Sequence, residues 1–194
     1  MKTCRRSFYL TLVSIFAIGI LSTCTNNAPV GPVITVKSSD NLQLTAIKDT
    51  RVALGLPNLT LESKGMDTMI NSPSRDLSVV IYVDSEGRKY SVEPRTNTVV
   101  EIDARDLLTS IPANVPSISQ DTLKTKALGI ARATTPNFDS LLPGLIDDSG
   151  SKGDLYFFDW RKPASQNEIM SPFIQIGFDK SGLIFAYINT LSLK

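Results

Sequence analysis

Cysteine has the most distinctive chemistry in this sequence, and it occurs twice, as Cys4 and Cys24. Histidine, the commonest general base and the commonest transition-metal ligand, is absent from the 194 residues. If residues 1–23 are removed as a leader peptide, which the N-terminal pattern described below indicates, Cys24 is the only cysteine left. An internal disulfide and a cysteine-based zinc site are then excluded, so we expect no metal and no cofactor.

Acidic residues gather between Asp147 and Asp154, as in a calcium-binding loop. An EF-hand loop supplies oxygen ligands from alternate positions along its first half. In a loop that starts at Asp148, Gly150 and Lys152 stand where ligands are needed. The pattern therefore fails, and we expect a polar loop before a strand.

Paired carboxylates could perform acid–base catalysis if two of them were held in a cleft. Asp84 and Glu86 lie in an expected turn. Glu93, Glu101 and Asp103 alternate with apolar residues on expected strands, so they should face solvent. The motif G-x-S-x-G is absent, although a Ser–Lys dyad of distant residues stays open. We therefore predict that the protein is not an enzyme and has no catalytic residues.

The N-terminus has the pattern of a secretory signal peptide. Lys2, Arg5 and Arg6 precede residues 8–21, which are uncharged and mostly apolar. This segment is shorter than the roughly 20 apolar residues that a membrane-spanning helix needs. We therefore assign residues 1–23 as a signal peptide and expect the protein to be exported.

The sequence Leu21-Ser22-Thr23-Cys24 resembles the lipobox of bacterial lipoproteins, although Thr23 stands where Gly, Ala or Ser is usual. The resemblance implies that Cys24 is lipidated and that residues 24–38, rich in Pro and Gly at their start, form a tether. The protein would then be anchored on the outer side of the cytoplasmic membrane or in the outer membrane. Ordinary secretion and an uncleaved anchor are the alternatives. Residues 5–8 also resemble a twin-arginine export motif.

Composition indicates a folded protein without affinity for nucleic acid. Hydrophobic residues make up 42% and charged residues 20% of the chain, which is ordinary for a globular protein. Beyond the leader, 17 basic and 19 acidic residues remain. We see no basic run there, so a nucleic-acid partner is not expected.

Two segments repeat at an offset of 74 residues. Residues 44–57 and 118–131 both begin with an aliphatic and a hydroxyl residue and contain Ala-Leu-Gly followed by an aliphatic residue. We predict a helix in each, with Thr45 and Ser119 as N-caps. In the second helix Leu123, Ala127, Ile130 and Ala131 share one face.

Strand patterns follow each predicted helix. The first half has strands at residues 77–83, 89–93 and 98–103, with turns at 84–87 and 94–97. The second half has a strand at 155–160 and a hairpin of residues 173–178 and 183–189 around a turn at 179–182. Each half therefore reads as helix, strand and hairpin.

This pattern resembles the PepSY family, small α+β modules of peptidase propeptides and cell-envelope proteins. The resemblance is carried by residues 118–131, 156–163 and 173–189, and more weakly by 90–103. It implies an α+β fold of two tandem small modules, each a helix packed on an antiparallel sheet. Module 1 would span residues 39–103, a linker 104–116, and module 2 residues 117–194.

The PepSY resemblance also implies a non-enzymatic function. We expect a cell-envelope protein that binds a protein or peptide, such as a protease that it restrains. A structural or assembly lipoprotein of the envelope is one alternative, and an enzyme of unrecognised type is another.

Aromatic residues concentrate on the strand at residues 155–160. The strand period of two separates Tyr156, Phe158 and Trp160 from Leu155 and Phe157. One set should fill the core while the other is exposed, unless both only pack the core. We select Tyr156, Phe158 and Trp160 as candidate partner-binding residues, with Trp160 first because tryptophan is enriched at binding hot spots.

Overall fold

One antiparallel sheet dominates the computed structural model, which describes residues 38–69, 77–110, 114–165 and 170–193. The signal peptide at 1–23 and the tether, except Ser38, lie outside the described residues. The strands are β1 (Leu61–Met69), β2 (Leu77–Asp84), β3 (Lys89–Glu93), β4 (Thr98–Asp103), β5 (Ile146–Asp147), β6 (Gly150–Lys152), β7 (Leu155–Arg161), β8 (Phe173–Asp179) and β9 (Ile184–Asn189). The helices are α1 (Ser38–Leu54), α2 (Gln120–Thr134) and α3 (Phe138–Leu141), with 3₁₀ turns η1 (Arg105–Ser110) and η2 (Leu142–Gly144).

The strand order joins the two halves of the chain through their last strands. The order is β1-β2-β3-β4-β9-β8-β7-β5, and β6 also pairs with β7. At the centre, β4 and β9 pair through Glu101 with Ile188, Ile102 with Tyr187, and Asp103 with Ala186. The α+β class is thus confirmed. Instead of two separate sheets, however, the described strands form one continuous nine-stranded sheet.

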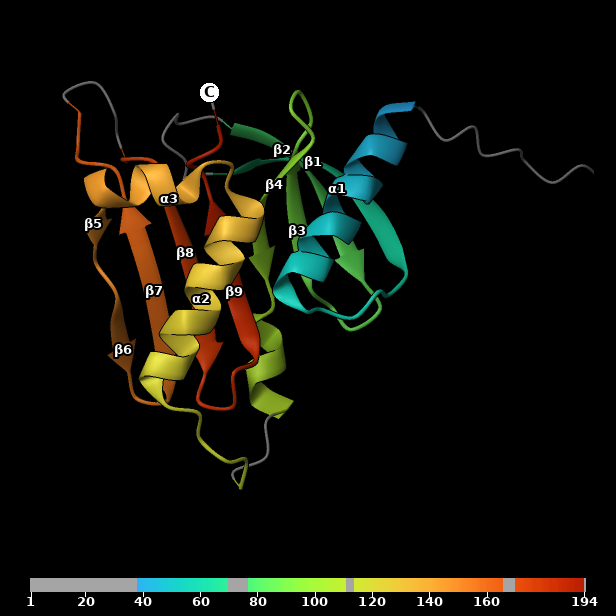
Figure 1. The fold of residues 1–194 in the computed structure, drawn as a ribbon. Coiled ribbons are helices and arrows are strands. Elements are labelled where there is room, and N and C mark those ends of the chain that lie inside the picture. The colour runs from blue at the N-terminus through green and yellow to red at the C-terminus, as the bar shows by residue number, and fades with distance from the viewer. Residues whose placement is uncertain (1–37, 70–76, 111–113, 166–169, 194) are drawn as a thin grey trace, which may run out of the picture. The chain divides into compact units, whose positions relative to one another are not determined.

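Both long helices cover the same face of the sheet (Figure 1). Helix α2 begins as predicted, because the Ser119 hydroxyl accepts a hydrogen bond from the Thr122 backbone N–H. Leu123, Ala127, Ile130 and Ala131 are its buried residues, also as predicted.

The predicted start of the first helix is wrong. Helix α1 begins at Ser38, and Thr45 lies inside it, where its hydroxyl donates to the Asn41 carbonyl oxygen at 2.8 Å. A threonine hydroxyl can bond to the backbone inside a helix as well as cap its end, so the residue type alone does not fix the boundary. The end is better marked, since Gly55 adopts a φ of 68° and Leu56 N–H bonds to the Arg51 carbonyl.

The predicted strands and turns from β2 to β4 and from β7 to β9 are confirmed within one or two residues. Gly87 and Gly182 adopt φ values of 93° and 82°, which glycine tolerates without strain. Strand β1 was not predicted. Most of its residues are exposed, it lacks an apolar alternation, and a bulge at Lys64 shifts its register with β2 between Ser63 and Gly65. It is an edge strand whose polar sequence carries little strand signal.

The segments that the sequence predicts to be irregular contain a 3₁₀ turn and two short strands. In the expected linker, η1 spans Arg105–Ser110, and Ala104 N–H donates to the Phe185 carbonyl at 2.9 Å. The expected polar loop after Asp147 instead forms the short edge strands β5 and β6 on β7. Asp147 itself binds the Lys124 ammonium at 2.8 Å.

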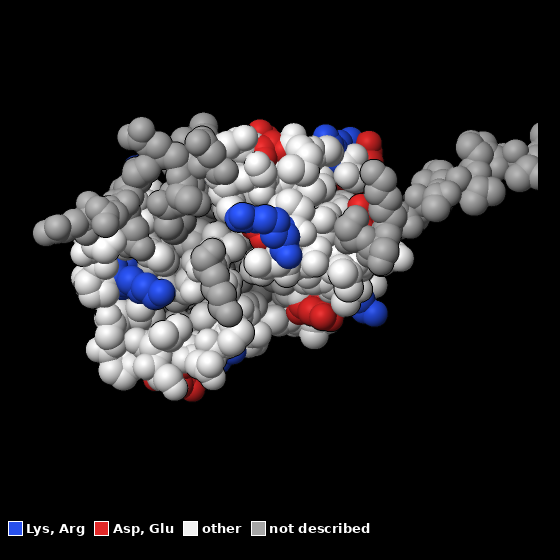
Figure 2. Space-filling view, turned by 90° about the horizontal axis from the view of Figure 1, so that it is seen from above, with Lys and Arg blue, Asp and Glu red and all other residues white. Residues whose placement is uncertain are grey.

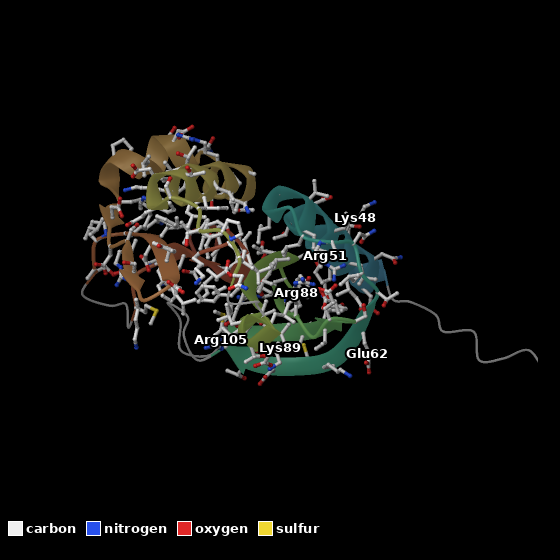
Figure 3. The ribbon with its side chains drawn as sticks, turned by 90° about the horizontal axis from the view of Figure 1, so that it is seen from below. Lys48, Arg51, Glu62, Arg88, Lys89 and Arg105 are labelled. Atoms are coloured by element: carbon white, nitrogen blue, oxygen red, sulfur yellow. The ribbon has the colours of Figure 1, made fainter. Side chains whose placement is uncertain are left out.

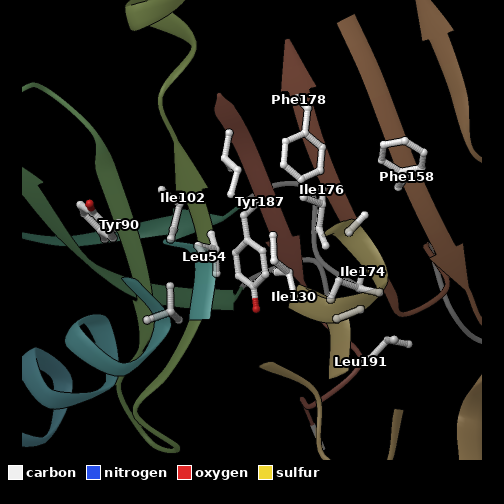
Figure 4. Packing of buried hydrophobic residues seen from close by; sticks show 14 of the residues in the cluster. Leu54, Tyr90, Ile102, Ile130, Phe158, Ile174, Ile176, Phe178, Tyr187 and Leu191 are labelled. Carbon is white, nitrogen blue, oxygen red and sulfur yellow. The ribbon is translucent and has the colours of Figure 1, made fainter. Parts of the chain in front are cut away.

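The main core lies between the sheet and the two helices (Figure 4). One row of opposed residues crosses six strands and faces the helices: Phe158, Ile176, Tyr187, Ile102, Tyr90 and Tyr82. A smaller cluster packs separately from this core: Met69, Leu77, Val79 and Val100. Ile188, which packs against the smaller cluster, also lines a hollow on the face away from the helices.

Two further properties concern the charge of the surface and the character of the helices. Seen from above, charged side chains of both signs are scattered among uncharged residues (Figure 2). Among the described residues, no helix has the length and apolar character needed to cross a membrane.

Candidate functional site

The aromatic residues selected from the sequence lie mainly in the core. Trp160 is 2% exposed and packs edge-on against Phe138, with ring centroids 5.7 Å apart. Phe158 is 1% exposed and contacts Phe178. Neither ring can touch a partner from the surface, so the choice of Trp160 and Phe158 as binding residues is corrected to core packing. Tyr156 lies on the same face of β7 but is half-buried at the edge of the core, and its selection stays a prediction.

The opposite face of β7 has a different character, because it turns away from the helices. In an antiparallel sheet, residues directly opposite each other on neighbouring strands share a face. One row on this open face joins Asp159, Gln175, Ile188, Glu101 and Ser91. The next row joins Phe157, Gly177, Ala186, Asp103 and Lys89. Figure 3 shows Lys89 and Arg105 on the side away from α2.

These two rows contain a hollow of about 330 Å³. Its size is at the lower end of the range of small-ligand sites. Apolar lining comes mainly from strands β7 and β9 and from η1. Polar lining comes from β4, from Arg105 at the start of η1 and from Gln175 on β8. The lining residues include Leu155, Phe157, Phe185, Ala186, Ile188 and Leu108, and, among polar residues, Glu101, Asp103, Arg105 and Gln175.

The shape of the hollow depends on a bulge and a glycine. The register of β8 and β9 shifts between Gly177 and Phe178, and Phe185 is the extra residue on β9. A Cβ atom on Gly177 would lie only 2.8 Å from Cζ of Phe185, so the absent side chain makes room for this ring. The Phe185 ring meets Phe157 edge-on at 5.4 Å between centroids.

The two carboxylates on β4 have different partners. Asp103 accepts two hydrogen bonds from the Arg105 guanidinium, at 2.9 and 2.6 Å, and these bonds lower the pKa of Asp103. Glu101 accepts only from the Ser91 hydroxyl, at 3.3 Å, and makes no ion pair within the described ranges. Burial raises the pKa of Glu101 more than the Ser91 bond lowers it.

A second polar cluster lies between α1 and the hairpin of β2 and β3, and the sequence did not reveal it. The Asp84 carboxylate is fully buried, and its Oδ2 atom accepts from Tyr90 Oη at 2.8 Å. The same oxygen lies 3.3 Å from a guanidinium nitrogen of Arg51 and 3.3 Å from one of Arg88. Figure 3 labels Arg51 and Arg88 near each other, one on α1 and the other in the turn between β2 and β3.

Arg51, Arg88 and Tyr90 all bond to the Asp84 carboxylate, although the buried Nε atom of Arg88 has no hydrogen-bond partner among the described residues. Burial alone would raise the pKa of Asp84, but the bonds from Tyr90 and from the Arg88 and Glu86 backbone N–H groups outweigh it and lower the pKa. Burial raises the pKa of Tyr90 to about 12, so its proton stays in place at neutral pH. A carboxylate that stays ionised and a tyrosine that keeps its proton suit anchoring of α1 better than proton transfer.

Glu93 was expected to face solvent, and that prediction is wrong. It is 2% exposed, because its carboxylate folds back over the turn between β3 and β4. It accepts from Arg95 Nε at 2.8 Å and from the Thr96 N–H and hydroxyl at 2.8 and 2.7 Å. Burial raises the pKa of Glu93, but these bonds outweigh it and lower the pKa to about 2.

Glu93 should make stability depend on pH. Its pKa in the folded protein lies below the ordinary value of 4.5, so ionised Glu93 stabilises the fold above that pH. This contribution should be lost as the pH falls from 4.5 toward 2. We expect Glu93→Gln to lower the urea midpoint at neutral pH and to approach the wild-type midpoint in acid. Glu62→Gln, at an exposed position, is the control, and a midpoint difference that does not change with pH would contradict the assignment.

No group of three or more acidic, histidine or cysteine side chains in the described ranges is placed to hold a metal ion. The Asp84 cluster anchors α1, and the Glu93 cluster closes the turn between β3 and β4. The carboxylates of β4 differ from both, because they lie beside a hollow with apolar walls and one of them, Glu101, makes no ion pair within the described residues. Comparison of the chain with family models, with curated proteins and with solved structures gives no match.

Proposed function

We propose that this protein is an exported lipoprotein whose folded part binds a protein or peptide segment and performs no catalysis. The observation that carries the proposal is the hollow on the open face of the sheet. It has apolar walls and a carboxylate, that of Glu101, which makes no ion pair with any described residue, and this combination suits recognition of another molecule. The other buried carboxylates of the described residues all accept internal hydrogen bonds, and they are Asp84, Glu93, Asp159 and Asp179.

The proposal includes two PepSY-like modules within the continuous sheet, at residues 39–103 and 117–194. Each half runs from a helix through a meander of antiparallel strands to a last strand, β4 or β9. These last strands pair with each other in antiparallel fashion. This order is what a duplicated unit would give if its two copies met edge to edge.

Membrane attachment through Cys24 is the third part of the proposal. The leader at residues 1–23 and the lipobox-like Leu21-Ser22-Thr23-Cys24 support it. A lipid on Cys24, with the tether that follows, would hold the folded part near a membrane surface. Protein partners of the cell envelope would then be within reach.

The test is photo-crosslinking in intact cell envelopes. A photoreactive residue replaces Leu155, on the wall of the hollow, and in a second protein it replaces Val52, which is exposed on α1. We expect a discrete adduct with one protein from position 155 and none from position 52. Equal adducts from both positions, or none from position 155, would contradict binding at the open face.

The same membranes report on the anchor. Mass spectrometry of the membrane-bound protein should give an N-terminal Cys24 that carries acyl chains. An unmodified Cys24, or a leader that is still attached, would refute the lipoprotein assignment without affecting the crosslinking result.

A further inference from the structure

We infer that the hollow on the open face receives a lysine or arginine side chain from a partner protein, with Glu101 as its counter-ion. This inference rests on the proposed binding function and adds the chemistry of the ligand. The expected ligand is a basic side chain that belongs to a polypeptide segment. Three features favour it: the partners of Glu101, the apolar and aromatic walls of the hollow, and the small size of Ala186.

Glu101 makes no ion pair in the described part of the chain, although Arg105 and Lys89 are close enough for their charges to act on it. Its neighbours across the sheet are Ser91 on β3 and Ile188 on β9, and neither carries charge. The Arg105 guanidinium is held by two bonds to Asp103, and Lys89 lies in the next row, opposite Asp103. A half-buried carboxylate with one long hydrogen bond has acceptor capacity left over, and a cation with N–H donors satisfies it best.

The walls suit the stem of such a side chain. Lysine and arginine carry aliphatic carbons that lie along apolar surface, with the charge at the far end. Leu155, Leu108 and Ile188 offer that surface. The rings of Phe157 and Phe185 also line the hollow, and an aromatic face attracts a cation.

The lining between the acidic and aromatic walls includes one small side chain, that of Ala186. Gly177, which opposes Ala186, makes room for the Phe185 ring and so helps to form the aromatic wall. A larger residue at position 186 would fill the space between the two walls. The size of Ala186 therefore allows another side chain to enter there.

Other ligand classes fit less well. An anion would meet Glu101 and Asp103 on the same wall. A wholly apolar ligand would cover the Glu101 carboxylate without giving it a partner, which costs free energy. A hard cation such as Ca²⁺ requires six or more oxygen ligands, and Asp103 is already bound to Arg105.

The test measures binding of a fluorescent peptide to the purified full-length protein in detergent, by anisotropy. The peptide Ala-Leu-Arg-Leu-Ala is compared with its citrulline analogue, which keeps the shape of arginine and removes the charge. We expect the arginine peptide to bind about 10- to 100-fold more tightly, as a hydrogen bond between charged groups would give. Equal affinities of the two peptides would overturn the inference.

Variants locate the binding. Glu101→Gln should remove the preference for arginine, and Ala186→Leu should weaken binding of both peptides by filling the space between the two walls. Glu62→Gln, which changes an exposed carboxylate on β1, is the matched control and should bind as wild type does. Circular dichroism melting shows that each variant is folded. An arginine preference that survives in Glu101→Gln would refute the role of Glu101.

Two comparisons separate this inference from the proposed function. If the crosslinked partner is captured equally by wild type, Glu101→Gln and Ala186→Leu, recognition of a basic side chain is refuted while partner binding stands. If the arginine peptide binds but position 155 yields no adduct, the proposed function fails and the chemistry of the hollow stands. Free argininamide that binds as tightly as the peptide would overturn the choice of a polypeptide ligand.

Discussion

Replacing Asp84 with alanine should destabilise the protein by about 3 to 5 kcal/mol, the cost expected when one member of a buried ion cluster is removed. The side chain of Asp84 is fully buried, and those of Arg51 and Arg88 are 2% and 5% exposed. Without the carboxylate, the buried Arg51 guanidinium would lose its ion-pair partner, and that of Arg88 would keep only the pair with the half-exposed Glu86. Tyr90 would lose an acceptor at the same time.

Urea denaturation followed by circular dichroism measures this effect. Asp139→Ala is the matched control, because Asp139 pairs with Arg132 at 2.8 Å while both side chains are at least half exposed. That change should alter the free energy of unfolding by no more than about 1 kcal/mol. If the two variants lose similar stability, the Asp84 cluster does not anchor α1 as we describe.

The second large effect is expected at Trp160. Replacement by alanine should cost about 3 to 5 kcal/mol, because it removes a buried ring and leaves a cavity beside Phe138. Binding of the arginine peptide should be unchanged, since Trp160 faces the helices and the hollow lies on the other face of β7. Urea denaturation and peptide anisotropy on the same preparation check both statements.

Phe157→Ala provides the converse result. Phe157 is half-buried and lines the hollow, so its loss should weaken peptide binding and cost less stability than the loss of Trp160. Weakened peptide binding in a folded Trp160→Ala protein would restore Trp160 as a binding residue. Unchanged binding in Phe157→Ala would remove the aromatic wall from the site.

The period of two along β7 was predictable from the sequence, but the direction of each face was not. The sequence separated Tyr156, Phe158 and Trp160 from Leu155 and Phe157, and the structure places the two sets on opposite faces. Which face meets the helices depends on how β7 pairs with β8 and how α2 packs on the sheet. Those contacts lie between distant parts of the chain. A preference for tryptophan at binding sites therefore selected a residue on the face that the helices cover.

The contacts of the buried polar groups could not be predicted from the sequence, for a related reason. Arg51 meets Asp84 across 33 residues and Tyr90 across 39. Neither spacing is a local pattern. Turn chemistry correctly placed Asp84 at the start of a turn, yet its burial depends on α1 lying over that turn. By contrast, the N-cap at Ser119 and the turn glycines Gly87 and Gly182 are fixed by local geometry, and they were predicted.

The pairing of β4 with β9 has a consequence for the order in which the strands can form. Strand β9 is the last of the described strands in sequence order, but it lies at the centre of the sheet. When the N-terminal half of the chain emerges first, β2, β3 and β4 can pair as local hairpins, which form quickly. The edge of β4 that does not pair with β3 stays unpaired until β9 is available, when Ile102 can pair with Tyr187. An unpaired edge invites association with other chains. A protein that crosses a membrane before folding would therefore be most exposed to aggregation along β4, late in its passage.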